Sequence, residues 1–159
     1  MLSDIAAAFI ELGLLGAARD ALVVLAATAQ EQYMRWLATV NLLEVASRER
    51  CEPVFEQYRR QLADVSLPVS LEASYYLTVG KGYSGFGRVE AARSALSKAI
   101  DLSIKHKFHQ INHEAEMELQ QLERSARTTR KTSEYQPTPR VEEIVAAIHD
   151  IREAAGLAR

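Results

Sequence analysis

Apolar residues recur at intervals of three and four along almost the whole chain. One stretch carries them at Leu15, Ala18, Leu22, Leu25 and Ala29, and no segment shows sustained alternation with a period of two. Intervals of three and four place side chains on one face of an α-helix. The pattern therefore predicts an all-α protein, with short connections that make neighbouring helices antiparallel. The predicted helices cover about 2–12, 14–28, 31–47, 51–63, 70–85, 88–106, 109–125 and 140–155.

The pattern weakens after residue 125 and predicts three regions. Residues 126–139 are polar and basic with almost no apolar periodicity, which is typical of a flexible linker. Thr138 and Pro139 then carry the residue types preferred at the start of a helix. We predict a helical domain over 1–125, a linker over 126–139 and an amphipathic C-terminal helix within 140–159.

Two parts of the helical domain repeat each other without a gap. Placing residues 6–22 over 80–96 brings Gly13 onto Gly87, and three alanines, an arginine and a leucine also coincide. The offset is 74 residues, or twice 37, which leaves room for one more copy between the two. A fixed period of this length predicts an array of helix–turn–helix units.

The copy near residue 80 resembles the tetratricopeptide repeat. The residues that carry the resemblance are, in order, Tyr76, Val79, Gly80, Tyr83, Ala92, Leu96 and Ala99. A second, weaker copy begins at residue 2, and the resemblance covers about 1–125. The middle unit, 31–63, departs from the pattern because it carries Phe55 where the family has a small alanine, and no copy ends in the proline that often closes these repeats.

The resemblance implies an α-solenoid, in which about three and a half antiparallel helix pairs stack into a right-handed superhelix. In the best copy we expect Gly80 and Ala92 to face each other where two helices approach most closely. Tyr76, Tyr83 and Leu96 would fill the space beside them, with Gly87 in the turn between the helices.

The glycines at 80, 82 and 85 also match the G-x-G-x-x-G spacing of nucleotide-binding loops. Such a loop follows a β-strand within a βαβ unit. The repeat pattern predicts a helix there, and no second βαβ element is present in the sequence, so we reject a phosphate site. Gly82 and Gly85 have no assigned role in the repeat.

Composition narrows the class of protein further. The chain has 19 Lys and Arg against 21 Asp and Glu, so its net charge of −2 offers no overall attraction to nucleic acid or to an anionic membrane. Cys51 is the only cysteine, which excludes an internal disulfide and fits a reducing compartment. No apolar run reaches the roughly 18 residues of a membrane span. We therefore expect a cytoplasmic protein that binds neither nucleic acid nor membrane.

Candidate chemistry is sparse. His109 and His113 lie one helical turn apart, with Glu116 on the same face, and such a pair can chelate zinc. Spacing alone supports this weak metal site, so a solvated pair is the favoured interpretation. A basic cluster at 124–131 lacks the interleaved aromatic residues typical of nucleic-acid binding. No arrangement of residues suggests catalysis, so we expect no enzyme activity and no cofactor.

Function is expected in the concave groove that the first helices of successive repeats would line. Proteins of the family that this chain resembles hold partner peptides or helices there. The residues that we predict to face the groove are Asn41, Glu44, Arg48, Thr78, Lys81, Ser84, Glu116 and Gln120. The chain would thus be a protein- or peptide-binding scaffold or adaptor. The alternative is the ligand- or peptide-sensing C-terminal domain of a larger bacterial regulator of transcription.

Mixed charges and apolar surface in this groove favour an amphipathic helix as the partner. The chain's own helix at 140–155 is one such helix, in cis or by exchange with a second copy. A second contact is expected at the N-terminal repeat, because no polar capping helix precedes it in the sequence. There we predict either a homodimer or stacking on an upstream part of a longer chain.

Overall fold

The computed structural model describes residues 2–133, 139–140, 143 and 146–147, and within 127–133 it describes the backbone alone. The described residues contain no strand, so the prediction of an all-α protein is confirmed. The helices are α1 (Leu2–Glu11), α2 (Leu15–Thr28), α3 (Gln32–Arg48), α4 (Glu52–Ala63), α5 (Val69–Gly85), α6 (Val89–His106) and α7 (His109–Ser133). The first six begin and end within one residue of their predicted bounds.

The prediction of a linker from residue 126 is wrong at its first eight positions, because α7 continues to Ser133. No proline or glycine occurs between residues 109 and 133, so nothing in the backbone chemistry ends the helix where its apolar pattern ends. Residues Met1–Arg124 form one compact unit and Ser125–Arg159 a second. Most of the predicted helix at 140–155 lies outside the described residues.

Three of the turns between helices repeat one backbone geometry, which the turn before α7 also adopts at Lys107 (φ 61°). Each contains a residue with positive φ: Gly13 (73°), Arg50 (58°) and Gly87 (76°). These residues are 37 positions apart, which is the period that the sequence predicts. The next amide donates to the carbonyl five residues back, as in the Schellman ending of a helix. These bonds join Leu14 to Phe9 at 2.8 Å, Cys51 to Ala46 at 3.0 Å and Arg88 to Tyr83 at 2.9 Å.

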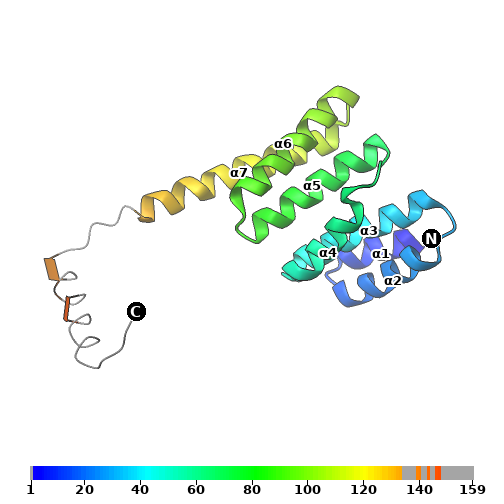
Figure 1. Cartoon of the computed structure of the whole chain (residues 1–159), viewed down its shortest axis with the longest axis horizontal. Coiled ribbons are helices and arrows are strands. Elements are labelled where there is room, and N and C mark those ends of the chain that lie inside the picture. Colours follow the sequence, from blue (N-terminus) through cyan, green and yellow to red (C-terminus); the bar gives the residue numbers. More distant parts are fainter. Residues whose placement is uncertain (1, 134–138, 141–142, 144–145, 148–159) are drawn as a thin grey trace. The chain divides into compact units, whose positions relative to one another are not determined.

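The turns define three helical hairpins, α1/α2, α3/α4 and α5/α6, and successive hairpins share buried cores. One cluster joins the first hairpin to α3 through Ala18, Leu22 and Val45. A second joins α3 and α4 to α5, with Phe55 fully buried in it. A third packs α5 and α6 against the first part of α7, around Leu96. In Figure 1 the hairpins follow one another from α1/α2 through α3/α4 to α5/α6, and the first part of α7 lies along α6.

The close approach expected at Gly80 is present, but its partner differs from the prediction. A Cβ on Gly80 would lie 2.6 Å from Leu96 Cγ, and the three heavy atoms nearest to it all belong to Leu96, so Leu96 makes the closest contact in place of Ala92. The helices α5 and α6 run antiparallel from the turn at Gly87. Gly80 lies seven positions before this turn and Leu96 nine positions after it, so the two residues lie at similar distances from the turn. Ala92 is nonetheless fully buried in the same core.

Gly82 has a role that the repeat pattern does not indicate. A Cβ there would lie 2.5 Å from Cζ of Phe55, in α4 of the preceding hairpin. The Phe55 ring packs edge-on against Tyr83 at 5.6 Å and against Phe86 at 5.3 Å between ring centroids. Gly82 therefore makes room for the large Phe55 ring at a position where the other two hairpins carry alanine, Ala18 and Ala92. Gly85, by contrast, has open space where a Cβ would be.

Candidate binding groove

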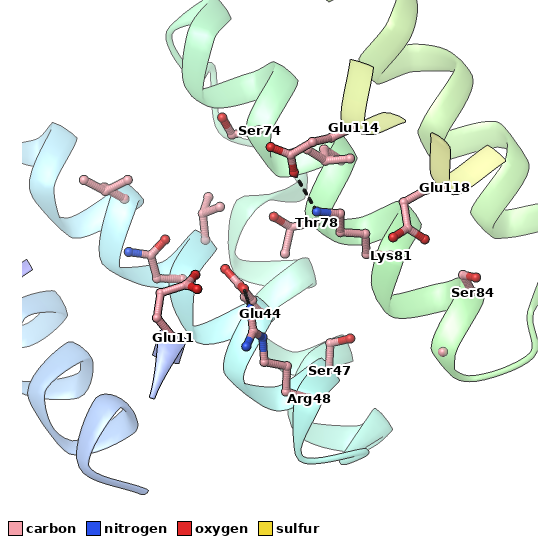
Figure 2. Close-up of a pocket in the computed structure, with 15 residues that line it drawn as sticks. Glu11, Glu44, Ser47, Arg48, Ser74, Thr78, Lys81, Ser84, Glu114 and Glu118 are labelled. Atoms are coloured by element: carbon pink, nitrogen blue, oxygen red, sulfur yellow. Dashed lines mark hydrogen bonds and ion pairs between the residues drawn. The ribbon is translucent and has the colours of Figure 1, made fainter. Parts of the chain in front are cut away.

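A cleft of about 660 Å³ lies within the unit formed by residues 1–124. Its lining side chains come from α1, α3, α5 and α7, and none of them belongs to α2, α4 or α6. Figure 2 shows Glu44, Ser47 and Arg48 of α3 and Thr78 and Lys81 of α5 around a common space. The first helices of the hairpins, together with α7, thus form one continuous wall.

The lining repeats with the same period as the turns. Six α3 positions line the cleft, and moving each by 37 residues gives one of the six α5 positions that line it. The pairs are Leu37 and Ser74, Val40 and Leu77, Asn41 and Thr78, Glu44 and Lys81, Ser47 and Ser84, and Arg48 and Gly85. The same shift relates Glu11 to Arg48, Leu77 to Glu114 and Lys81 to Glu118. Each helix therefore presents the same stripe to the cleft.

Six of the eight predicted groove residues line this cleft. They are Asn41, Glu44, Arg48, Thr78, Lys81 and Ser84. The prediction is wrong for Glu116 and Gln120, which are exposed and do not line it. Glu114 and Glu118 line the cleft instead. They lie one helical turn apart on one side of the buried residue Ala115, whereas Glu116 and Gln120 lie on its other side.

Both basic residues of the cleft are held by neighbouring carboxylates. Arg48 bonds Glu44 Oε1 at 2.7 Å and also donates to the carbonyl of Ile10, at the end of α1, at 3.2 Å. Lys81 Nζ donates to Glu114 Oε2 at 2.8 Å, which connects α5 to α7 (Figure 2). The bond from Lys81 holds the pKa of the Glu114 carboxyl below its usual range, outweighing the effect of burial.

The rest of the wall is apolar or carries neutral polar groups. Val40 and Leu77 are buried and contribute apolar surface at its floor. The side chains of Asn41, Thr78 and Ser84 make no hydrogen bond with any described residue, whereas Ser74 Oγ donates to the carbonyl of Ser70. Apolar surface with unused amide and hydroxyl groups suits a ligand that has both apolar side chains and a polar backbone.

A hydrogen-bonded network joins α4 to α5 outside the cleft. The Tyr83 hydroxyl donates to Glu56 Oε1 at 2.7 Å, and Arg59 Nε donates to the other oxygen of Glu56 at 2.9 Å. Burial and the bond to Glu56 together raise the pKa of Tyr83 to about 12. Although burial of Glu56 acts to raise its pKa, the bonds from Tyr83 and Arg59 leave that pKa below its ordinary value.

The histidines singled out as a weak metal site lie in the first two turns of α7. His109 and His113 are both exposed. Among the residues whose side chains the structure describes, no three His, Cys, Asp or Glu side chains lie close enough to hold a metal ion. The predicted grouping of these histidines with Glu116 is therefore not formed, and the Glu116 carboxylate accepts a hydrogen bond from Asn112 at 3.0 Å.

The first hairpin exposes apolar side chains that its counterparts bury. Ile5 is 40% exposed, whereas the residues 37 and 74 positions later, Leu42 and Val79, are 2% and 5% exposed. Leu42 packs in the core shared with α1 and α2, and Val79 in the core shared with α3 and α4. No described element packs on this surface of α1. It is the surface that the predicted N-terminal contact would cover.

Within the described part of the chain, no helix combines the length and the hydropathy needed to cross a membrane. Comparison of the chain with models of protein families, with curated proteins and with solved structures found no match.

Proposed function

We propose that residues 2–124 form a tetratricopeptide-like solenoid and that the chain is a scaffold that binds a segment of a partner protein in the cleft. The observation that carries this proposal is the 37-residue periodicity of the lining, in which every contributing helix is the first of a hairpin or its equivalent, α7. A surface built from one stripe per repeat is elongated and continuous. That shape suits a peptide or helix better than a compact small molecule.

The chemistry of the stripe supports the same class of ligand. A bound helix can place its apolar face on Val40 and Leu77. An extended peptide can instead direct its backbone groups to the unused side chains of Asn41 and Thr78. Either mode leaves the ion pairs of Arg48 and Lys81 in place, so the wall is preformed for binding.

Site-specific photo-crosslinking in the native cell tests the proposal. A photoreactive phenylalanine analogue at Thr78 would face the cleft, and the same residue at Ser97, exposed on α6, serves as the matched control. We expect a discrete adduct of higher mass from position 78 that position 97 does not give. Mass spectrometry should map the partner half of that adduct to one short segment. Identical adducts from both positions, or none from position 78, would contradict a binding role for the cleft.

A further inference from the structure

The ionisable side chains of the cleft do not balance in charge. It contains four carboxylates and two basic groups. Arg48 forms an ion pair with Glu44 and a hydrogen bond with the carbonyl of Ile10, and Lys81 forms an ion pair with Glu114. Glu11 and Glu118 remain, and neither forms a hydrogen bond or ion pair with any residue of the described part of the chain. The cleft therefore carries an uncompensated charge of −2.

The two unpaired carboxylates are contributed by the first and last helices of the wall. Glu11 is the last residue of α1, and Glu118 lies in the third turn of α7. Figure 2 shows them on different helices, with α3 and α5 supplying the wall between. These two intervening helices contribute the apolar lining residues Val40 and Leu77. A ligand that covers this floor would meet one carboxylate toward each end of the cleft.

We propose that the cleft selects a partner segment that carries Lys or Arg on both sides of an apolar stretch. This inference rests on the proposed function and names the chemistry of its ligand. Each basic side chain would pair with one unpaired carboxylate while the apolar stretch covers the floor. An acidic segment is disfavoured, because it would face Glu11 and Glu118 directly and could gain a cation only by breaking the pairs of Arg48 or Lys81.

Selection from a displayed library of random 12-residue peptides, with the full chain as the target, tests this chemistry. Binders would be sorted for loss of binding to Ser84→Trp, which fills the cleft from the last turn of α5. The affinities of the sorted peptides would then be measured for Glu11→Gln/Glu118→Gln. Neither carboxylate has a described partner, so the double variant should fold normally. The matched control, Glu31→Gln/Glu123→Gln, removes two exposed carboxylates outside the cleft.

We expect the sorted peptides to be enriched in Lys and Arg. Loss of two exposed ion pairs should weaken their binding about tenfold in the cleft variant, with little change in the control. Raising the salt concentration should reduce the difference between wild type and variant. Cleft-dependent peptides that lack this enrichment, or that bind the cleft variant as tightly as wild type, would overturn the inference and leave the proposed function standing. Failure to recover any peptide sensitive to Ser84→Trp would count against both.

Discussion

Equivalent positions of the repeat meet at two junctions, one between the first two hairpins and one between the second and third. The large and the small side chain of the pair are exchanged between these two junctions. At the first junction Ala18 of α2 and Val45 of α3 lie in one buried cluster. Thirty-seven residues later, the same positions hold Phe55 of α4 and Gly82 of α5, whose Cα faces the ring of Phe55. At the first junction the small residue lies on the second helix of the hairpin and the larger one on the next helix. At the second junction the large residue lies on the second helix and the small one on the next.

The third junction returns to the first arrangement. Ala92 of α6 and Leu119 of α7, 37 residues beyond Phe55 and Gly82, share a cluster again. What the repeat preserves is thus the volume shared between neighbouring helices, rather than a small residue at one position. Phe55 departs from the small residue found at Ala18 and Ala92 only when its own hairpin is viewed alone, since the compensating residue lies 27 positions away in the next hairpin.

Removing the ring of Phe55 should break this junction. Phe55 is fully buried, so Phe55→Ala should lower the free energy of unfolding by about 3–5 kcal/mol, from lost burial and the cavity left beside Gly82. Urea unfolding followed by circular dichroism measures the change. A loss below about 1 kcal/mol would show that the ring does not hold the two hairpins together.

The exchange of sizes gives this prediction a sharper form. Phe55→Ala/Gly82→Val converts the junction to the pair found at Ala18 and Val45, so the added side chain should occupy the space left by the ring. We expect the double variant to be more stable than the sum of its single changes by about 1–3 kcal/mol. Strictly additive effects would contradict a compensating pair.

Two glycines of α5 should differ in how much their replacement by alanine changes the stability of the protein. Gly82→Ala should destabilise the protein by about 1–3 kcal/mol, because the new Cβ would overlap the buried ring of Phe55. Gly85→Ala meets nothing within 4 Å and should be neutral or stabilising by up to about 1 kcal/mol. Thermal unfolding of both variants separates a packing requirement from a general effect of glycine on the helix. Equal effects of the two changes would contradict the packing account.

The sequence predicts the features of the fold that depend on local patterns, but not those that depend on contacts between distant helices. Helix positions and the 37-residue period follow from local patterns, because Gly13 and Gly87 mark equivalent turns. Six groove residues follow from helical periodicity within α3 and α5. Gly82 could not be assigned, since its reason is a contact with a distant helix, and spacing within α5 carries no information on that contact.

The errors in α7 have two different causes. Glu118 could have been found by moving Lys81 forward by 37 residues, a signal present in the sequence, whereas Glu116 was predicted from apolar spacing inside α7 alone. The end of α7 could not be located in this way. Its polar residues up to Ser133 carry neither an apolar stripe nor a helix-breaking residue, so composition suggested a linker where the backbone is helical.

The hydroxyl of Tyr83 distinguishes the third hairpin from the first, where the equivalent residue is Phe9. The pKa of Tyr83 is raised from 10.0 to about 12, so the folded state holds this proton more tightly than the unfolded state. The resulting stability is present below pH 10 and is lost as the pH rises toward 12. Tyr83→Phe should therefore show a smaller loss of stability across this range than wild type, measured by urea unfolding at each pH. Identical pH profiles would contradict a bond from Tyr83 to Glu56 that matters for stability.

The turn of the middle hairpin should give the smallest effect, and one of opposite sign. Arg50 has φ 58° where the other two hairpins have glycine, and a side chain in this left-handed conformation costs about 1 kcal/mol. Arg50 also donates to the carbonyl of Gly85 at 2.8 Å, an exposed contact that Arg50→Gly would remove. We expect Arg50→Gly to raise the free energy of unfolding by about 0.5–1 kcal/mol, because relief of the backbone outweighs that bond. Arg50→Ala loses the bond but keeps the Cβ, so it should bring no gain. If both changes destabilise the protein equally, the bond to Gly85 outweighs the backbone conformation, and the middle turn differs from the other two in what stabilises it.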